Sequence, residues 1–307
     1  MNKKLQLFVA IPDSSLSDEK NLREKTIKIG RFARSFSIFG INKIILYKDR
    51  TFTKNTKSDQ KLMKLILDFL NTPQYLRKLI FPINPALTNI GLLPPIRAPQ
   101  HKKKINLKDV KPGDLRIGYL YQRDYLNNLK FDNNINTKRK FHFDIANDKY
   151  KFYVDVGLDL PIPFLGKGIE GQKLVIKFID HYPNLKAVRA TECDMEREYL
   201  GYDIWDVDSL EMYLKSLEPK AFVVFTSRKG RPFNNMDSQF KDLIKKFNIL
   251  LIVFGSPSKG IDKIYPNYHT QRNSLYLNLF PNQKTETIRL EEAILGTLAI
   301  FNHIMQK

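Results

Sequence analysis

Apolar and polar residues alternate between strand-like and helix-like spacing at both ends of the chain. An apolar run at residues 5–11, an amphipathic stretch at 18–39 and a second apolar run at 43–47, after Gly40, predict a β-α-β opening. Residues 60–70 carry their apolar side chains at helical spacing on one side. The carboxyl-terminal part repeats this alternation, with strands predicted at 221–226, 249–255 and 275–279 and helices at 208–217, 237–247 and 290–305.

The strands predicted at 221–226 and 249–255 are almost continuously apolar. Parallel strands that are covered by helices on both faces have this composition, whereas half-exposed strands alternate apolar with polar residues. The two ends of the chain are therefore predicted to form one α/β domain around a parallel sheet.

The middle of the chain has a different pattern. Residues 72–101 cannot form regular helices throughout, because they contain six prolines: Pro73, Pro82, Pro85, Pro94, Pro95 and Pro99. Residues 102–180 then show short alternating stretches separated by turns, which predicts a small all-β barrel with strands at 115–121, 141–145, 151–156 and 173–179. We therefore expect a discontinuous α/β domain of residues 1–100 and 181–307, with residues 101–180 as an insertion.

The charge is strongly positive: the 307 residues include 51 Lys and Arg and 32 Asp and Glu, which gives a net charge of +19. Residues 1–58 contribute 13 basic and 5 acidic residues, and residues 97–155 contribute 14 and 7. A polyanionic partner is expected, and nucleic acid is favoured over anionic lipid because 21 Phe and 14 Tyr residues are interleaved with the lysines. The alternative is a solvated basic surface without a partner.

Cysteine content and hydropathy limit the kinds of site and the cellular location to be expected. Cys193 is the only cysteine, so an intramolecular disulfide and a four-cysteine zinc module are excluded. No apolar run approaches the roughly 20 residues that span a membrane. We expect no metal, no membrane partner and an intracellular, cytoplasmic protein, or a nuclear or nucleolar one if the source is eukaryotic.

Three segments that follow predicted strands combine glycine, proline, hydroxyl and basic residues: 226–232, 255–260 and 278–287. Ligands of open parallel sheets bind outside the carboxyl ends of the strands. Neither G-x-G-x-x-G nor G-x-x-x-x-G-K-[ST] occurs in these segments, which disfavours a common nucleotide-binding loop. Ordinary turns remain the alternative.

Residues 278–295, NLFPNQKTETIRLEEAIL, resemble the signature N-x-x-P-x-Q-G-x-x-T-[IV]-R-T-E-E-A-[IL]-L of one family of SPOUT methyltransferases. This is the archaeal and eukaryotic ribosomal RNA uridine methyltransferase family with an inserted β-barrel. Shorter matches occur at residues 72–78, 91–93, 201–202 and 254–255. The resemblance implies a trefoil-knotted SPOUT methyltransferase domain, an inserted OB-like barrel, S-adenosylmethionine as cofactor and a homodimer. Lys284 replaces a signature glycine, and Leu290 replaces a threonine.

The resemblance also implies a set of site residues. Cofactor contacts are expected from the three loops, at Thr226, Lys229, Gly255, Asn278, Leu279, Phe280, Thr285, Thr287 and Ile288. The segment Gly30-x-x-x-Arg34-x-x-x-x-Phe39-Gly40 resembles an amino-terminal SPOUT motif whose arginine faces the substrate. Arg34 and Arg289 are the candidate catalytic cations, because a nearby cation stabilises the anion of a deprotonated uridine imide. The alternative for Arg34 is an exposed helix residue or a dimer salt bridge, and none of the five histidines is assigned as a base.

The insertion is expected to bind RNA through its basic residues and aromatic rings. Phosphate contacts are expected at Lys102, Lys103, Lys104, Arg116, Lys138, Arg139 and Lys140, and base stacking at Tyr119, Tyr121, Phe141 and Phe143. These features together predict an S-adenosylmethionine-dependent methyltransferase that acts on a uridine of ribosomal RNA. The alternative is a catalytically silent RNA-binding or ribosome-assembly factor with the same fold, which Lys284 favours slightly.

Overall fold

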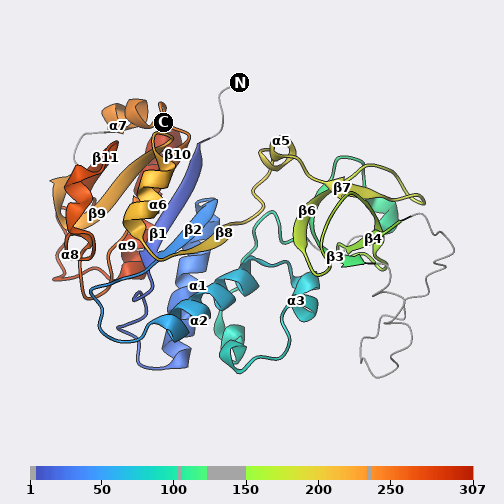
Figure 1. Ribbon diagram of the computed structural model, residues 1–307, viewed down its shortest axis with the longest axis horizontal. Helices are drawn as coiled ribbons and strands as arrows, with labels where there is room; N and C mark the ends of the chain where they lie inside the picture. Colours follow the sequence, from blue (N-terminus) through green and yellow to red (C-terminus); the bar gives the residue numbers. More distant parts are fainter. Residues whose placement is uncertain (1–4, 103–105, 123–149, 234–236, 307) are drawn as a thin grey trace. The chain divides into compact units, whose positions relative to one another are not determined.

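The computed structural model describes residues 5–102, 106–122, 150–233 and 237–306 (Figure 1). The chain divides into two compact units. Unit 1 consists of Met1–Asn71, Ile83–Ile96 and Gly201–Lys307, and unit 2 consists of Thr72–Pro82 and Arg97–Leu200. The predicted boundary at residue 180 falls inside unit 2, because a later strand closes its barrel.

Unit 1 is built on a sheet in which every described strand pair is parallel, in the order β11-β9-β10-β1-β2-β8. The strands are β1 (Gln6–Pro12), β2 (Lys43–Tyr47), β8 (Asp203–Val207), β9 (Ala221–Pro232), β10 (Ile249–Val253) and β11 (Ser274–Asn278). The apolar runs of β1, β9 and β10 lie in the middle of the sheet, where both faces are covered. The parallel sheet predicted from these runs is confirmed.

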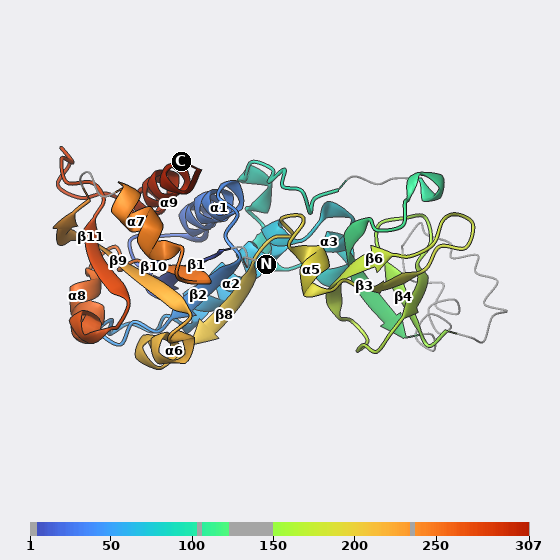
Figure 2. The same cartoon turned by 90° about the horizontal axis from the view of Figure 1, so that it is seen from above.

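Helices cover both faces of this sheet, as Figure 2 shows. One face carries α1 (Leu22–Ile38), α7 (Asp237–Ile244) and α9 (Leu290–Gln306), and α6 (Leu210–Leu217) and α8 (Ile261–Ile264) cover the other. On the second face, apolar residues of α6 and α8 share one core cluster with alternate residues of the strands; Leu214 and Ile261 belong to it together with Phe225 and Val253. The remaining elements of unit 1 are α2 (Lys57–Asn71) and three 3-10 turns, η1 (Pro85–Leu87), η2 (Ile90–Leu92) and η4 (Pro266–Thr270).

Several helix boundaries follow from local chemistry. Asn21 caps α1, since its side chain accepts a hydrogen bond from the Glu24 amide, so the helix begins later than residue 18. Ser209 caps α6 in the same way. The proline-rich connector is not wholly irregular, because residues between Pro73 and Pro82 form α3 (Gln74–Ile80). No described helix is both long and apolar enough to cross a membrane.

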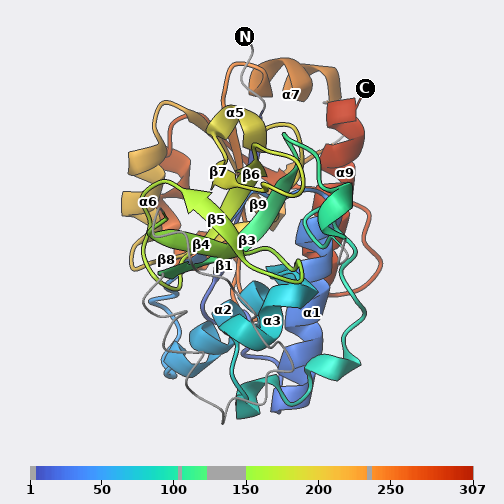
Figure 3. The same ribbon diagram turned by 90° about the vertical axis from the view of Figure 1, so that its right-hand side faces the viewer.

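Unit 2 contains a closed barrel with the strand order β3-β4-β5-β7-β6, which faces the viewer in Figure 3. Its strands are β3 (Leu115–Gln122), β4 (Phe152–Asp155), β5 (Ile162–Leu165), β6 (Lys173–Phe178) and β7 (Ala187–Arg189). The pairs are antiparallel except β5 with β7. In β6, buried Leu174, Ile176 and Phe178 alternate with half-buried residues, which is the pattern that a barrel wall requires.

The predicted barrel is thus confirmed, although its strands were only partly identified. Sequence patterns did not indicate β5, β7, the sheet-edge strand β8, the short helix α5 (Glu192–Met195) or the turn η3 (Leu107–Asp109). The strand predicted at residues 141–145 lies outside the described residues. Short strands of three to five residues give too few positions for an alternation to stand out.

Candidate functional site

The three loops singled out in the sequence follow neighbouring strands. β9 lies between β11 and β10, and all three strands are parallel. Their carboxyl ends therefore meet at one edge of the sheet, where the segments after Phe225, Val253 and Asn278 leave it. This is the edge at which open parallel sheets bind ligands.

Direct contacts hold these loops together. The Thr226 hydroxyl donates to the Val253 carbonyl at 3.0 Å, and Lys229 Nζ pairs with Asp262 at 3.0 Å. The Asn278 side-chain amide donates to the Arg228 carbonyl at 2.9 Å. Arg228 in turn donates to the Glu286 carbonyl. The first loop therefore contacts the third loop and the two elements that flank the second loop, β10 and α8, and the Asp262 carboxylate raises the pKa of Lys229.

Two glycines allow main chain to approach main chain at this edge. A Cβ at Gly255 would lie 2.7 Å from the Lys259 carbonyl oxygen, and one at Gly230 would lie 2.4 Å from the Leu277 carbonyl carbon. The pairing of β9 with β11 shifts register between Tyr276 and Leu277, so that Phe225 faces Tyr276 and Arg231 faces Leu277. The residues between Phe225 and Arg231 thus bulge out of the sheet against the end of β11.

The predicted cofactor residues play different parts in this arrangement. Asn278 connects the third loop to the first, and Thr226 and Lys229 connect the first loop to β10 and α8. Leu279 is 7% exposed and the Phe280 ring lies against Gly296, so both side chains pack inward. Thr285 and Thr287 are exposed and Ile288 is half-buried. Among the described residues, the hydroxyls of both threonines make no hydrogen bond, which leaves them free for a ligand.

Lys284, which replaces the signature glycine, is exposed in this loop. Within the part of the chain that the structure describes, Asn273 is the one residue other than glycine with a positive φ. The lysine is consequently not held in a left-handed conformation, and the loop has no strain at this position. The replacement gives no structural argument against ligand binding.

Arg34 is exposed on α1 and donates to the Pro95 carbonyl at 3.2 Å. One turn earlier, Gly30 leaves room for Leu93, whose Cδ2 would lie 2.6 Å from a Cβ at that position. Gly30 and Arg34 therefore hold residues 93–95 against α1. No contact within the described residues joins Arg34 to the three loops. Arg289 is also exposed, its main-chain amide donates to Glu292 at 3.0 Å, and its guanidinium contacts no described acceptor.

Sequence reasoning missed a buried ionic cluster beside the signature loop. Lys28 on α1 is 1% exposed, and its Nζ lies 2.5 Å from Asp18, 3.7 Å from Glu19 and 3.7 Å from Glu291. Glu291, at 4% exposed, also accepts from Arg31 at 3.1 Å. Since Glu291 lies in the first turn of α9, shortly after the loop of residues 278–287, the cluster fixes the start of α9 against α1. The partners are too far apart in sequence for spacing to indicate them.

The predicted RNA contacts of unit 2 need one correction. Arg116 is 2% exposed, donates to the Val156 carbonyl at 2.8 Å and lies over the Tyr75 ring, so it is a barrel residue and not a phosphate contact. Tyr121 is likewise buried, at 3% exposed, whereas Tyr119 is half-buried. Lys102 pairs with Glu198 at 3.0 Å and keeps a side-chain exposure of 32%. The other predicted residues lie outside the described residues: Lys103, Lys104, Lys138, Arg139, Lys140, Phe141 and Phe143.

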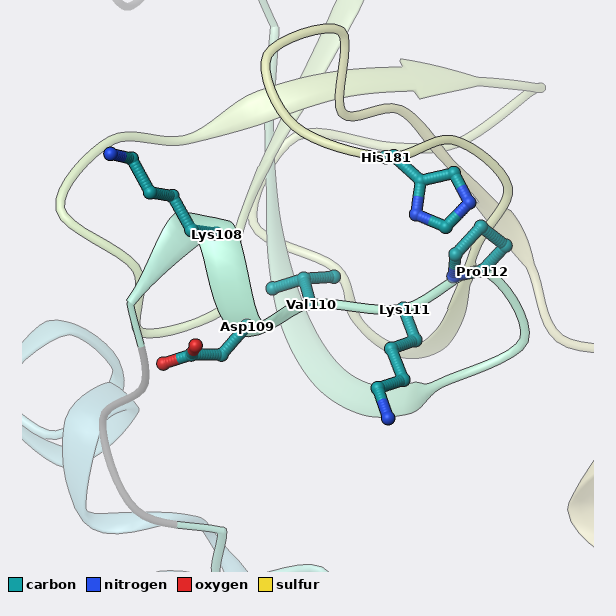
Figure 4. Close-up of a pocket in the computed structure, with 6 residues that line it drawn as sticks. All are labelled: Lys108, Asp109, Val110, Lys111, Pro112 and His181. Carbon is teal, nitrogen blue, oxygen red and sulfur yellow. The ribbon is translucent and has the colours of Figure 1, made fainter.

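Each unit also has a surface hollow with a basic lining. In unit 1, a hollow of about 490 Å³ lies between the starts of α1 and α2 and includes Lys20, Lys25 and Lys61. In unit 2, a hollow of about 680 Å³ is lined by Lys108, Asp109, Val110, Lys111, Pro112 and His181 (Figure 4). Neither hollow is lined by the three loops.

Comparison with known proteins connects these features to one family. The family described as "Putative RNA methyltransferase" matches residues 6–301, nearly the whole chain. A 28S rRNA (uridine-N(3))-methyltransferase of Drosophila melanogaster is 25% identical over 98% of this chain, which spans 62% of that protein. Its Homo sapiens counterpart is 25% identical over 95% of this chain and 77% of its own length. An uncharacterized protein of Haloarcula marismortui is 22% identical over 94% of this chain and 96% of its own length.

Proposed function

Because the chain belongs to this RNA methyltransferase family, we propose that it transfers a methyl group from S-adenosylmethionine to a base nitrogen of a uridine in ribosomal RNA. The family match over residues 6–301 carries the proposal. The names of the fly and human relatives support a uridine of ribosomal RNA as substrate and N3 as the target atom. The net charge of +19 supports a polyanionic substrate.

We propose that the methyl donor binds at the carboxyl edge of β9, β10 and β11. The residues there fit a ligand with polar nucleoside and amino-acid ends, since they offer exposed threonine hydroxyls at Thr285 and Thr287 and main-chain groups around Gly255. Buried Leu279 and Phe254 provide an apolar floor. S-adenosylmethionine, when bound, supplies a methyl group already activated by its sulfonium. The chain therefore has to orient the target nitrogen and exclude water.

The second requirement is stabilisation of the uridine anion that forms when N3 loses its proton. We propose Arg34 for this role, because among the described residues its guanidinium donates only to the Pro95 carbonyl, and the residue is exposed. Arg289 is the second candidate, since it stands at the end of the signature loop. No contact joins Arg34 to the loops of its own chain among the described residues, which is consistent with the homodimer that the family resemblance implies. Sedimentation analysis tests the dimer.

We also propose the trefoil knot for unit 1. The proposal is supported by the bulge of β9 around the end of β11, by the main-chain approach at Gly230, and by the contacts of Arg228 with Asn278 and Glu286. A crystal structure with S-adenosylmethionine bound tests both the threading and the cofactor position. A chain that passes beside the loop of residues 226–231 without threading would rule out the knot.

Unit 2 is proposed as an OB-like RNA-binding domain. In its closed barrel β5 and β7 pair in parallel, and all other neighbouring strands pair antiparallel. Small barrels of this kind bind oligonucleotides. The two units correspond to a methyltransferase domain and an inserted RNA-binding domain, with bounds as in the compact units.

Purified protein, isotopically labelled S-adenosylmethionine and a ribosomal RNA transcript test the proposed function. We expect labelled 3-methyluridine after nucleoside digestion and mass spectrometry. Cofactor binding without any transfer to RNA would favour the catalytically silent RNA-binding factor. Absence of binding at millimolar S-adenosylmethionine would remove the enzyme proposal.

A further inference from the structure

The hollow at one end of the barrel has two walls from segments distant in sequence. The segment that leads into β3 contributes Lys108 to Pro112, and the turn between β6 and β7 contributes His181. The Gly113 amide donates to the Phe178 carbonyl at 2.7 Å and so connects the walls. Val110, 2% exposed, packs in the barrel core, which anchors the first wall. The two segments that line the hollow are therefore attached to the folded barrel.

Lysines of unit 2 differ in whether they pair with a carboxylate, and the lining of the hollow contains Lys108 and Lys111 together with Asp109. Lys102, Lys177 and Lys186 each pair with a carboxylate, at 3.0, 2.8 and 2.9 Å. By contrast, the ammonium groups of Lys108 and Lys111 contact no carboxylate among the described residues, and both side chains are exposed. Figure 4 shows that they extend from the segment in different directions. This geometry suits two separate anionic groups along a chain better than one small anion.

An aromatic ring lies beside one of these cations. Tyr182, next to His181, is 48% exposed, and Lys108 Nζ lies 5.8 Å from the centroid of its ring. Lys186 pairs with Asp180, and the Ile179 amide donates to the Lys186 carbonyl at 3.0 Å, so the turn that carries both rings is fixed. Exposed aromatic rings held beside lysines are the usual surface for stacking unpaired bases while phosphates are neutralised.

From this combination we infer that the hollow binds a single-stranded segment of RNA, with Lys108 and Lys111 on phosphates and Tyr182 or His181 stacked on a base. The turn between β6 and β7 joins the fourth and fifth strands of the barrel, and the corresponding loop of OB folds takes part in oligonucleotide binding. The inference deepens the proposed function, on which it rests, by assigning the substrate's unpaired strand to a surface outside the loops of unit 1.

Binding of a short fluorescein-labelled oligouridylate to the full chain tests this inference. The double variant Lys108→Ala and Lys111→Ala should reduce the slope of log affinity against log salt by roughly 1.4, since each lost phosphate contact removes about 0.7. At about 0.15 M salt, this reduction in slope corresponds to a loss of affinity of roughly tenfold. Tyr182→Ala should weaken binding by about fivefold or more, whereas Tyr182→Phe keeps the ring and should bind like the wild type.

The matched control is the double variant Lys151→Ala and Lys167→Ala, which removes the same charge from exposed positions of the barrel outside the hollow. An equal loss of affinity in the control, or competition by polyglutamate as strong as by unlabelled oligouridylate, would overturn the inference in favour of a general polyanion surface. Methyl transfer by the wild-type protein is measured in parallel. Its absence counts against the proposed function alone, whereas its presence with unchanged RNA binding in the variants counts against the hollow alone.

Discussion

Replacing Lys28 by methionine tests whether the buried ionic cluster holds the start of α9 against α1. Methionine keeps most of the side-chain volume but removes the charge that faces Asp18, Glu19 and Glu291. Glu291 Oε2 is buried without a hydrogen-bond partner among the described residues and lies 3.7 Å from Lys28 Nζ, while Oε1 of the same carboxylate pairs with Arg31 at 3.1 Å. Removal of one partner from a buried pair typically costs about 3–5 kcal/mol, and the loss here should lie toward the lower end of that range, because Arg31 still pairs with Glu291 and Asp18 is partly exposed.

Urea unfolding followed by the fluorescence of Trp205, the only tryptophan and a residue of β8 in unit 1, measures this cost. Lys25→Met is the control, because Lys25 pairs with Asp59 at side-chain exposures of 23% and 20% and should lose about 1 kcal/mol or less. Adding Glu291→Gln to Lys28→Met should recover part of the loss, with a coupling energy of at least about 1 kcal/mol. A Lys28→Met protein as stable as the Lys25→Met control would refute the electrostatic tie between α1 and α9.

Three further predictions concern the loops, the candidate catalytic arginine and the barrel. Gly255→Ala should weaken S-adenosylmethionine binding at least tenfold by calorimetry, because its Cβ would lie 2.7 Å from the Lys259 oxygen. The control Gly91→Ala, whose Cβ would have no atom within 4 Å, should bind like the wild type. Equal binding by both variants would show that the loop after β10 does not form the site. Arg34→Ala should leave S-adenosylmethionine affinity unchanged and lower methyl transfer tenfold or more, about 1.4 kcal/mol, and unchanged turnover would return Arg34 to a role in seating residues 93–95. Hydrogen bonds from Lys177 and then Thr191 hold the pKa of Asp194 well below its usual range, so its contribution to stability is full above the unfolded-state pKa of about 4 and is lost as the pH falls below it. Asp194→Asn should therefore destabilise the protein at pH 7 and much less at acid pH, and a difference independent of pH would contradict this assignment.

The sheet of unit 1 was predictable because its central strands are apolar on both faces. A run such as residues 249–253 would leave apolar side chains in water if only one face of its strand were covered. The loops after β9, β10 and β11 could be placed at one edge once the strands were known to be parallel. Sequence could not indicate β8, because its burial is mixed and its place beside β2 depends on long-range pairing.

Side-chain roles were less predictable than positions. Arg116 cannot be told from an exposed cation by sequence, yet it is buried in the barrel and donates to the Val156 carbonyl. Lys28 stands in a helix of mixed polarity, and only the fold brings Glu291 to it from the other end of the chain. Ionic and hydrogen-bond partners distant in sequence leave no local pattern, which is why the cluster and the basic hollow were found in the structure alone.

The central claim is that this chain methylates a uridine of ribosomal RNA, and nucleoside mass spectrometry of ribosomal RNA from cells with and without the gene tests it most directly. We expect 3-methyluridine at one position to disappear without the gene, to return with the wild-type gene, and to stay absent with the Gly255→Ala variant. Levels of every methylated nucleoside that are the same with and without the gene would contradict the claim.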